Sequence, residues 1–283
     1  MSKLSGRYSG AKLLNEEIPG GEPLIEGFLW RHDNNIIVGK EKSGKSVLSL
    51  QIAFSLTSGE PLFGEYRVTS PCSVAYIQVE GKIADTQSNV RNMQKALPFD
   101  PSKFEVFYYP GIPFDIDKGY NYIISQIDSW QKPDVVIIDP LYLFMQGDMK
   151  DDEPSRQFVL NVRRMMDYYG STHIINHHAH RIFRDSKTGR IVDEGDNSIF
   201  GSFVWKAFPD NVYLFELIGH KKHRLSCNTQ RMGKSISEVV LDMVQPSPLY
   251  FRPIADGLSS DEKKKLVLFT IKSNWSAMTI PSL

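Results

Sequence analysis

The sequence predicts an α/β fold: a doubly wound, mostly parallel sheet with an antiparallel extension at its C-terminal end. Two patterns predict this fold. Short runs rich in Val and Ile alternate along the chain with longer segments of helical periodicity. Several of the short runs are nearly continuous in apolar residues, which is typical of strands that are buried on both faces of a parallel sheet.

Strand and helix candidates follow one another in order. The strand candidates are the short apolar runs at residues 35–38, 73–79, 104–109, 134–138, 172–176 and 212–217. The helix candidates between them are residues 46–58, 120–130 and 154–169. The first helix stops at Gly59 and the third at Gly170, because glycine is favoured just past a helix C-terminus. The second places Ile123 and Ile127 on one stripe.

The character of the sequence changes after residue 212. Residues 212–217 and 236–243 are predicted strands on either side of a charged stretch at 220–224, and we interpret them as the antiparallel extension. Residues 256–283 contain one helical stretch, 261–273, and are too few for an independent core. They are either a docked helix or the start of an incomplete domain. We therefore divide the chain into an N-terminal segment (1–25), an α/β core (26–255) and a helical tail (256–283).

The composition is that of an ordinary globular chain. It has 283 residues, of which 41% are hydrophobic and 23% charged. Lys plus Arg equals Asp plus Glu, at 33 each, so there is no overall basic excess of the kind that indicates nucleic-acid binding. Cys72 and Cys227 lack partners at metal-ligand spacing and are expected to be reduced thiols. Without a signal segment or a run of about 18 apolar residues, we expect a soluble cytoplasmic protein with no membrane partner.

A phosphate-binding loop lies between the first predicted strand and the first predicted helix. The spacing Gly-x4-Gly-Lys-Ser is the P-loop pattern, and the apolar run before it and the helix after it supply the required context. The backbone N–H groups of such a loop surround phosphate oxygens, its lysine faces the β and γ phosphates, and its serine hydroxyl binds Mg²⁺. The sequence therefore predicts ATP and Mg²⁺ as cofactors. The loop residues are Gly39, Lys40, Glu41, Lys42, Ser43, Gly44, Lys45 and Ser46.

Two carboxylates follow predicted strands. Asp139 ends one strand, and in an open parallel sheet ligands bind beyond the carboxyl ends of the strands. An acid there, beside a P-loop strand, is placed to hold Mg²⁺ with Ser46; the alternative is a strand that ends in a turn at Pro140. Glu80 ends another strand and is a candidate for orienting or deprotonating the attacking water. Its alternative is a solvated loop acid.

Four histidines, His173, His177, His178 and His180, fall within eight residues. Three interpretations remain open. A zinc site is one, although neighbouring strand residues point to opposite faces and no Cys or carboxylate completes a ligand set. A polar strand end is the second. The third is a γ-phosphate sensor, which requires the strand 172–176 to lie beside the strand that ends in Asp139.

These motifs together resemble the RecA-like ATPases. Within that group the chain is most similar to the hexameric replicative DNA helicases of plasmids and phages, the RepA type. The likeness rests on the order of the motifs and on three segments, residues 18–29 (IPGGEPLIEGFL), 176–181 (NHHAHR) and 197–202 (NSIFGS). It covers roughly residues 12–250.

The resemblance implies a role for each matching residue. Glu80 becomes the catalytic glutamate, Asp139 the metal-side aspartate and His178 the sensor. Lys222 and Arg224 match a Lys-x-Arg pair that reaches the ATP of the neighbouring subunit. The sequence also departs from the family at three places. Lys40, Glu41 and Lys42 stand where the family usually has small residues. Bulky residues follow Gly201-Ser202, and the loop 148–153 is acidic.

The leading hypothesis is a ring-forming, ATP-driven DNA helicase or translocase acting in plasmid-type or phage-type DNA replication, with single-stranded DNA as partner and a homo-hexamer as its assembly. Four cations in the connection 181–200 are the candidate phosphate contacts for DNA. Acidic residues in the same connection favour a merely solvated loop. The alternatives are a RecA-like regulatory or loader ATPase without unwinding activity and, third, a small-molecule kinase. The four cations are Arg181, Arg184, Lys187 and Arg190.

Overall fold

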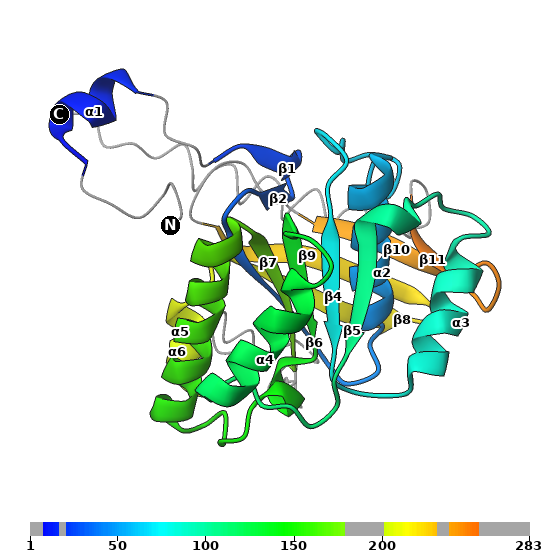
Figure 1. The fold of residues 1–283 in the computed structure, drawn as a ribbon. Coiled ribbons are helices and arrows are strands. Elements are labelled where there is room, and N and C mark those ends of the chain that lie inside the picture. Colours follow the sequence, from blue (N-terminus) through cyan, green and yellow to red (C-terminus); the bar gives the residue numbers. More distant parts are fainter. Residues whose placement is uncertain (1–7, 17–20, 179–200, 231–237, 255–283) are drawn as a thin grey trace, which may run out of the picture. The chain divides into compact units, whose positions relative to one another are not determined.

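The computed structural model describes residues 8–16, 21–178, 201–230 and 238–254 (Figure 1). The chain divides into two compact units, Met1–Arg252 and Pro253–Leu283, and the fold and sites described below belong to the first. The predicted tail helix at 261–273 and the four cations predicted to bind DNA, Arg181, Arg184, Lys187 and Arg190, lie outside the described residues.

A nine-stranded sheet is the centre of the fold, and its strand order is β11-β10-β9-β8-β3-β7-β6-β4-β5. A separate ribbon contains β1 (Pro23–Ile25) and β2 (Leu29–Trp30). The strands of the large sheet are β3 (Asn34–Gly39), β4 (Val74–Gln78), β5 (Phe104–Tyr108), β6 (Val135–Asp139), β7 (Thr172–His178), β8 (Asn211–Gly219), β9 (Lys222–Gln230), β10 (Glu238–Val244) and β11 (Tyr250–Pro253).

The predicted α/β fold is confirmed. Strands β8, β3, β7, β6, β4 and β5 pair in parallel, and β9 pairs antiparallel with both β8 and β10. The predicted antiparallel extension is present, and the charged stretch 220–224 between its predicted strands is a tight turn followed by the first residues of a further strand, β9. Its polar and apolar residues alternate, with His223 and Leu225 buried on one face, so it lacks the continuous apolar run of the parallel strands.

Helices cover both faces of the sheet. They are α2 (Lys45–Ser58), α3 (Ile83–Met93), α4 (Asp117–Asp128) and α5 (Asp152–Tyr169), with the short α1 (Gly10–Asn15), α6 (Val204–Ala207), η1 (Pro101–Lys103) and η2 (Leu141–Phe144). Figure 1 shows α4 and α5 side by side, and Arg164 of α5 forms an ion pair with Asp117 of α4 at 2.9 Å. No helix among the described residues has the length and apolar character needed to cross a membrane.

Two hydrophobic clusters show how the sheet is buried. Ile37 belongs to the cluster formed with α2, whereas Ile36 belongs to the cluster formed with α4 and α5. Neighbouring residues of a strand point to opposite faces, so β3 is covered on both sides. The P-loop strand therefore lies deep within the sheet, with β8 on one side and β7 on the other.

Candidate nucleotide-binding site

The P-loop connects the end of β3 to the start of α2. Both of its glycines are required by their surroundings. Gly44 has φ +90°, and a Cβ atom there would lie 3.2 Å from the Phe251 ring. A Cβ atom on Gly39 would lie 2.6 Å from the Phe215 carbonyl oxygen. The loop therefore packs directly against the C-terminal strands, and side chains at these two positions are excluded.

Lys45 is the buried cation of this loop. Its Nζ donates to the carbonyl oxygens of Gly39 and Lys40, both at 2.8 Å. Burial lowers the Lys45 pKa to about 8, against the opposing effect of Asp139, Glu80 and Glu41. These three carboxylates are therefore close enough in space to act on one ammonium group.

Several donors at the start of α2 fit a phosphate group. The helix begins after Gly44 with no side-chain cap, so its first N–H groups are available to an anion. The Ser43 hydroxyl is buried and has no hydrogen-bond partner within the described parts of the chain. The exposed Ser46 follows Lys45 on the first turn. A buried unpaired hydroxyl, a buried lysine and open backbone donors together suit a bound triphosphate.

Asp139 ends β6, as predicted, but β6 does not lie beside the P-loop strand, because β7 separates β6 from β3. Its carboxylate accepts a hydrogen bond from Asn176 of β7 at 2.8 Å and another from the Tyr76 phenol of β4. Burial and Asp139 raise the pKa of the Tyr76 phenol, and the nearby Ser46 opposes that shift. Ser46 and Asp139 therefore lie near the same phenol, and their hard oxygen donors suit Mg²⁺.

Glu80 lies two residues past the end of β4 and is exposed. Its Oε1 atom accepts a hydrogen bond from the Tyr142 hydroxyl at 3.1 Å. The Tyr142 ring lies edge-on to the His178 ring, with 4.6 Å between the ring centroids. The structure therefore brings two of the predicted catalytic residues, Glu80 and His178, into contact with one tyrosine, Tyr142, which sequence reasoning missed.

His178 ends β7, directly opposite Gly39 in the pairing of β7 with β3. Its pKa is lowered by burial and by the charge of Lys45, and its Nε2 atom has no hydrogen-bond partner in the described structure. The sensor interpretation required β7 to lie beside the strand that ends in Asp139. β7 pairs with β6, so this requirement is met.

Two other histidines of the cluster, His173 and His177, are core residues. His173 is fully buried between Ser171 and Asn34, and burial lowers its pKa to about 3. His177 is buried near the Trp205 ring, and burial lowers its pKa to about 4. Within the described ranges no three His, Cys, Asp or Glu side chains group as a metal site, and His180 lies outside those ranges. The described histidines therefore give no support to a zinc site.

A comparison with known protein families identifies the family to which this site belongs. A family model described as an AAA domain matches residues 7–181. The chain belongs to this AAA-domain family. The matched residues include the P-loop, Glu80, Asp139 and His178, so the parts described above lie within the region shared with the family.

The fold of this AAA-domain protein is also found in a solved structure. A KaiC-like protein from the hyperthermophilic archaeon Pyrococcus horikoshii OT3 is similar with a TM-score of 0.55 at 16% sequence identity. The match covers 84% of this chain and 96% of that one. No curated protein matches the chain. Family and fold together make the protein a RecA-like P-loop ATPase.

The two cations predicted to act on a neighbouring subunit lie on β9 of the AAA-domain protein. Lys222 and Arg224 share one face of the strand, as their spacing predicts. Arg224 lies 3.2 Å from Glu238 of β10 and 4.0 Å from Glu216 of β8. Within its own chain, Arg224 is therefore neutralised by carboxylates on both flanking strands.

The opposite face of β9 packs on a side chain that borders the nucleotide-binding loop of the ATPase. His223 lies between the two cations in sequence and is buried. Its ring stacks on Phe215 at 5.0 Å and hydrogen-bonds with the backbone of Lys221. Phe215 in turn lies against Gly39 and Gly44. Strand β9 therefore has one face that packs on Phe215 beside the P-loop and one face that bears the cations.

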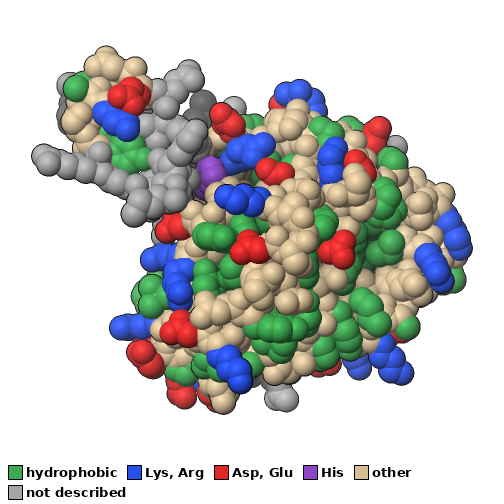
Figure 2. Space-filling model, viewed as in Figure 1, with side chains coloured by type: hydrophobic (Ala, Val, Ile, Leu, Met, Phe, Trp, Pro, Cys, Tyr) green, Lys and Arg blue, Asp and Glu red, His purple; other side chains and the backbone are tan. Residues whose placement is uncertain are grey.

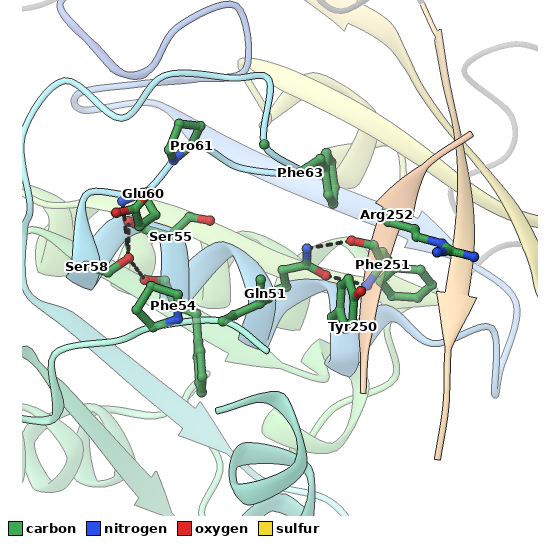
Figure 3. A pocket seen from close by; sticks show the side chains of 13 residues that line it. Gln51, Phe54, Ser55, Ser58, Glu60, Pro61, Phe63, Tyr250, Phe251 and Arg252 are labelled. Carbon is green, nitrogen blue, oxygen red and sulfur yellow. Dashed lines mark hydrogen bonds between the residues drawn. The ribbon is translucent and has the colours of Figure 1, made fainter. Parts of the chain in front are cut away.

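A small cavity of about 180 Å³ lies along the C-terminal half of α2 (Figure 3). Phe54 and Phe63 form part of its wall, and Gln51 exchanges two hydrogen bonds with the backbone of Phe251, at 2.7 and 2.8 Å. Because its lining includes none of residues 39–46, this cavity is not the phosphate site. Its hydrogen bonds fasten β11 to the helix that follows the P-loop.

Proposed function

We propose that this ATPase hydrolyses ATP with Mg²⁺, using Glu80 to activate the attacking water. The proposal is carried by one observation: Lys45, Asp139, Glu80 and His178 come from four different parts of the chain and lie at one edge of the sheet. Lys45 binds the β and γ phosphates, and Ser46 and Asp139 hold the metal. Mg²⁺ neutralises charge that develops on the phosphates. Tyr142 orients Glu80 through its hydrogen bond, and His178 senses the γ phosphate.

We further propose that hydrolysis drives a ring-forming DNA helicase or translocase. The order of the motifs and the Lys222–Arg224 pair support this proposal, because an ATP site completed by a neighbouring chain belongs to an assembled ring. Single-stranded DNA is the proposed partner and a hexamer the proposed assembly. The candidate DNA contacts are Arg181, Arg184, Lys187 and Arg190.

A regulatory ATPase without unwinding activity is the second candidate. On the face shown in Figure 2, the Lys and Arg side chains of the described residues are interspersed with Asp and Glu, and no continuous basic surface is seen there. The KaiC-like protein shares the fold alone. The mixed charges on this face are the observation that supports a switch or loader.

One experiment tests hydrolysis and separates the two candidates. Glu80→Gln should keep ATP affinity but slow turnover about 100-fold or more, because the amide keeps the acceptor for Tyr142 and loses the base. Steady-state phosphate release measures this. Single-stranded DNA should raise wild-type turnover if the protein is a motor, whereas turnover that ignores DNA supports the regulatory function. Normal turnover by Glu80→Gln would place the catalytic base elsewhere.

A further inference from the structure

Four side chains form a hydrogen-bonded chain around the Asp139 carboxylate. Tyr76 donates to Oδ2 of Asp139. Asn176 donates to Oδ1 of Asp139 at 2.8 Å, and Ser49 donates to Oδ1 of Asn176 at 3.1 Å. Because Ser49 follows Ser46 on the first turns of α2, the chain links Asp139 to the helix that carries Ser46.

Tyr76 is the member of this chain that donates to the proposed metal ligand Asp139 from β4. It is 1% exposed and packs in an apolar cluster, where its ring lies edge-on to Phe104 at 6.3 Å. A buried hydroxyl is costly unless it is hydrogen-bonded, and a phenylalanine would fill the same space without that cost. The hydroxyl therefore serves the carboxylate to which it donates, Asp139 of β6.

We propose that Tyr76 is a positioning residue that holds the Asp139 carboxylate in the orientation Mg²⁺ requires. The inference rests on the proposed Mg²⁺-dependent ATP binding. Mg²⁺ tolerates little departure from octahedral geometry, and the groups that hydrogen-bond to metal ligands fix the orientation of those ligands. Asp139 accepts hydrogen bonds on both of its carboxylate oxygens, from Tyr76 of β4 and from Asn176 of β7, the two strands that flank β6.

The test compares nucleotide binding with and without the metal. A fluorescent ATP analogue is titrated in EDTA and at increasing Mg²⁺, with wild-type protein and with Tyr76→Phe. The variant should raise the Mg²⁺ concentration for half-maximal binding by about 10- to 100-fold, the usual effect of losing a partner of a metal ligand. Its affinity for the analogue in EDTA should stay within about twofold of wild type, because Tyr76 does not contact phosphate.

Tyr169→Phe is the matched control. The Tyr169 side chain is also buried, and its hydroxyl donates to a carboxylate, Asp128, at 3.1 Å, on the other face of the sheet. This control loses a comparable tyrosine hydrogen bond and should keep the wild-type Mg²⁺ dependence. Circular dichroism checks that both variants are folded. If Tyr76→Phe does not fold, wild-type protein with ¹³Cζ-labelled tyrosine replaces it, and the Tyr76 signal should shift when Mg²⁺ joins the nucleotide complex.

The outcomes separate this inference from the proposed function. An unchanged Mg²⁺ midpoint in folded Tyr76→Phe, an equal loss of affinity in EDTA and in Mg²⁺, or a Tyr76 signal that Mg²⁺ leaves unmoved overturns the positioning role alone. Wild-type protein that fails to bind the analogue at any Mg²⁺ concentration overturns the proposed function and this inference with it. A raised midpoint in Tyr76→Phe together with an unmoved midpoint in Tyr169→Phe supports the inference.

Discussion

Two effects on the pKa of the Lys45 ammonium group oppose each other: burial removes the group from water, and nearby carboxylates attract its charge. Burial favours its neutral form and lowers its pKa to about 8, although Asp139, Glu80 and Glu41 favour the charged form. A bound triphosphate brings further negative charge, which stabilises the protonated lysine. Binding of ATP and protonation of Lys45 are therefore linked.

The linkage gives a prediction for the effect of pH on ATP affinity. Affinity should be full below about pH 8 and should fall as the pH rises through that value, by up to about tenfold per pH unit, because free protein must first take up a proton. Calorimetry in buffers of different ionisation heat measures this uptake. Lys45→Arg is the control, since its guanidinium stays charged and should flatten the pH dependence. Wild-type affinity that is equal at pH 7 and pH 9.5 would contradict the linkage.

The predicted site residues and the missed ones differ in their sequence signal. Glu80, Asp139 and His178 end apolar runs, and the carboxyl ends of parallel strands meet at one edge, so their proximity could be predicted. Tyr76 and Tyr142 could not, because an aromatic residue inside a strand or after a proline looks like core packing. Only the structure shows that their hydroxyl groups reach the carboxylates.

At the scale of elements, β9 is the strand whose two faces have different tasks. Its buried face packs His223 on Phe215, which borders the P-loop, whereas its other face holds Arg224 between Glu216 and Glu238. An arginine that acts on a neighbouring chain must exchange these carboxylates for phosphate oxygens. Carboxylate and phosphate groups are both acceptors that match the geometry of a guanidinium group.

Mixing two inactive variants tests whether Arg224 acts on a neighbour. Arg224→Ala and Lys45→Ala should each lose ATP hydrolysis, since a finger of this kind is worth about 10³-fold or more in rate. In mixed assemblies some sites combine an intact P-loop with an intact arginine, so phosphate release should partly return.

Arg252→Ala is the matched control for this experiment. Arg252 is also paired with a carboxylate, Asp242 at 3.0 Å, but it has no proposed catalytic role. Its loss should leave hydrolysis intact. Full activity of Arg224→Ala alone, or mixtures that exchange subunits and stay inactive, would show that Arg224 has no such role.

At the scale of the whole molecule, the parallel part of the sheet could be predicted from the sequence, whereas helix α3 and the edge strand β11 could not. The central strands are apolar on both faces and lie within one or two residues of their predicted ends. Helix α3 was missed because Met93 is its only buried residue, which leaves no apolar stripe. The short β11 was missed because its pattern depends on packing against α2 through Gln51.

Assembly is the whole-molecule property that follows from the proposed function. We expect a particle of six times the chain mass in the presence of ATP, and we expect single-stranded DNA to stabilise it, because each ATP site is completed by a second copy. Mass photometry with and without ATP and DNA measures this. Lys45→Ala should not respond to ATP. A wild-type particle that remains one chain under all conditions would exclude both the ring and the arginine finger.

The crowding around the P-loop also determines which substitutions a lineage of such proteins can accumulate. Gly39 and Gly44 are walled in by Phe215 and Phe251, and Ser43 and Lys45 are buried. Positions 40–42 instead face solvent, so the long side chains of Lys40, Glu41 and Lys42 meet no such wall. We therefore expect substitutions to be tolerated more readily in the middle of the motif than at its two glycines.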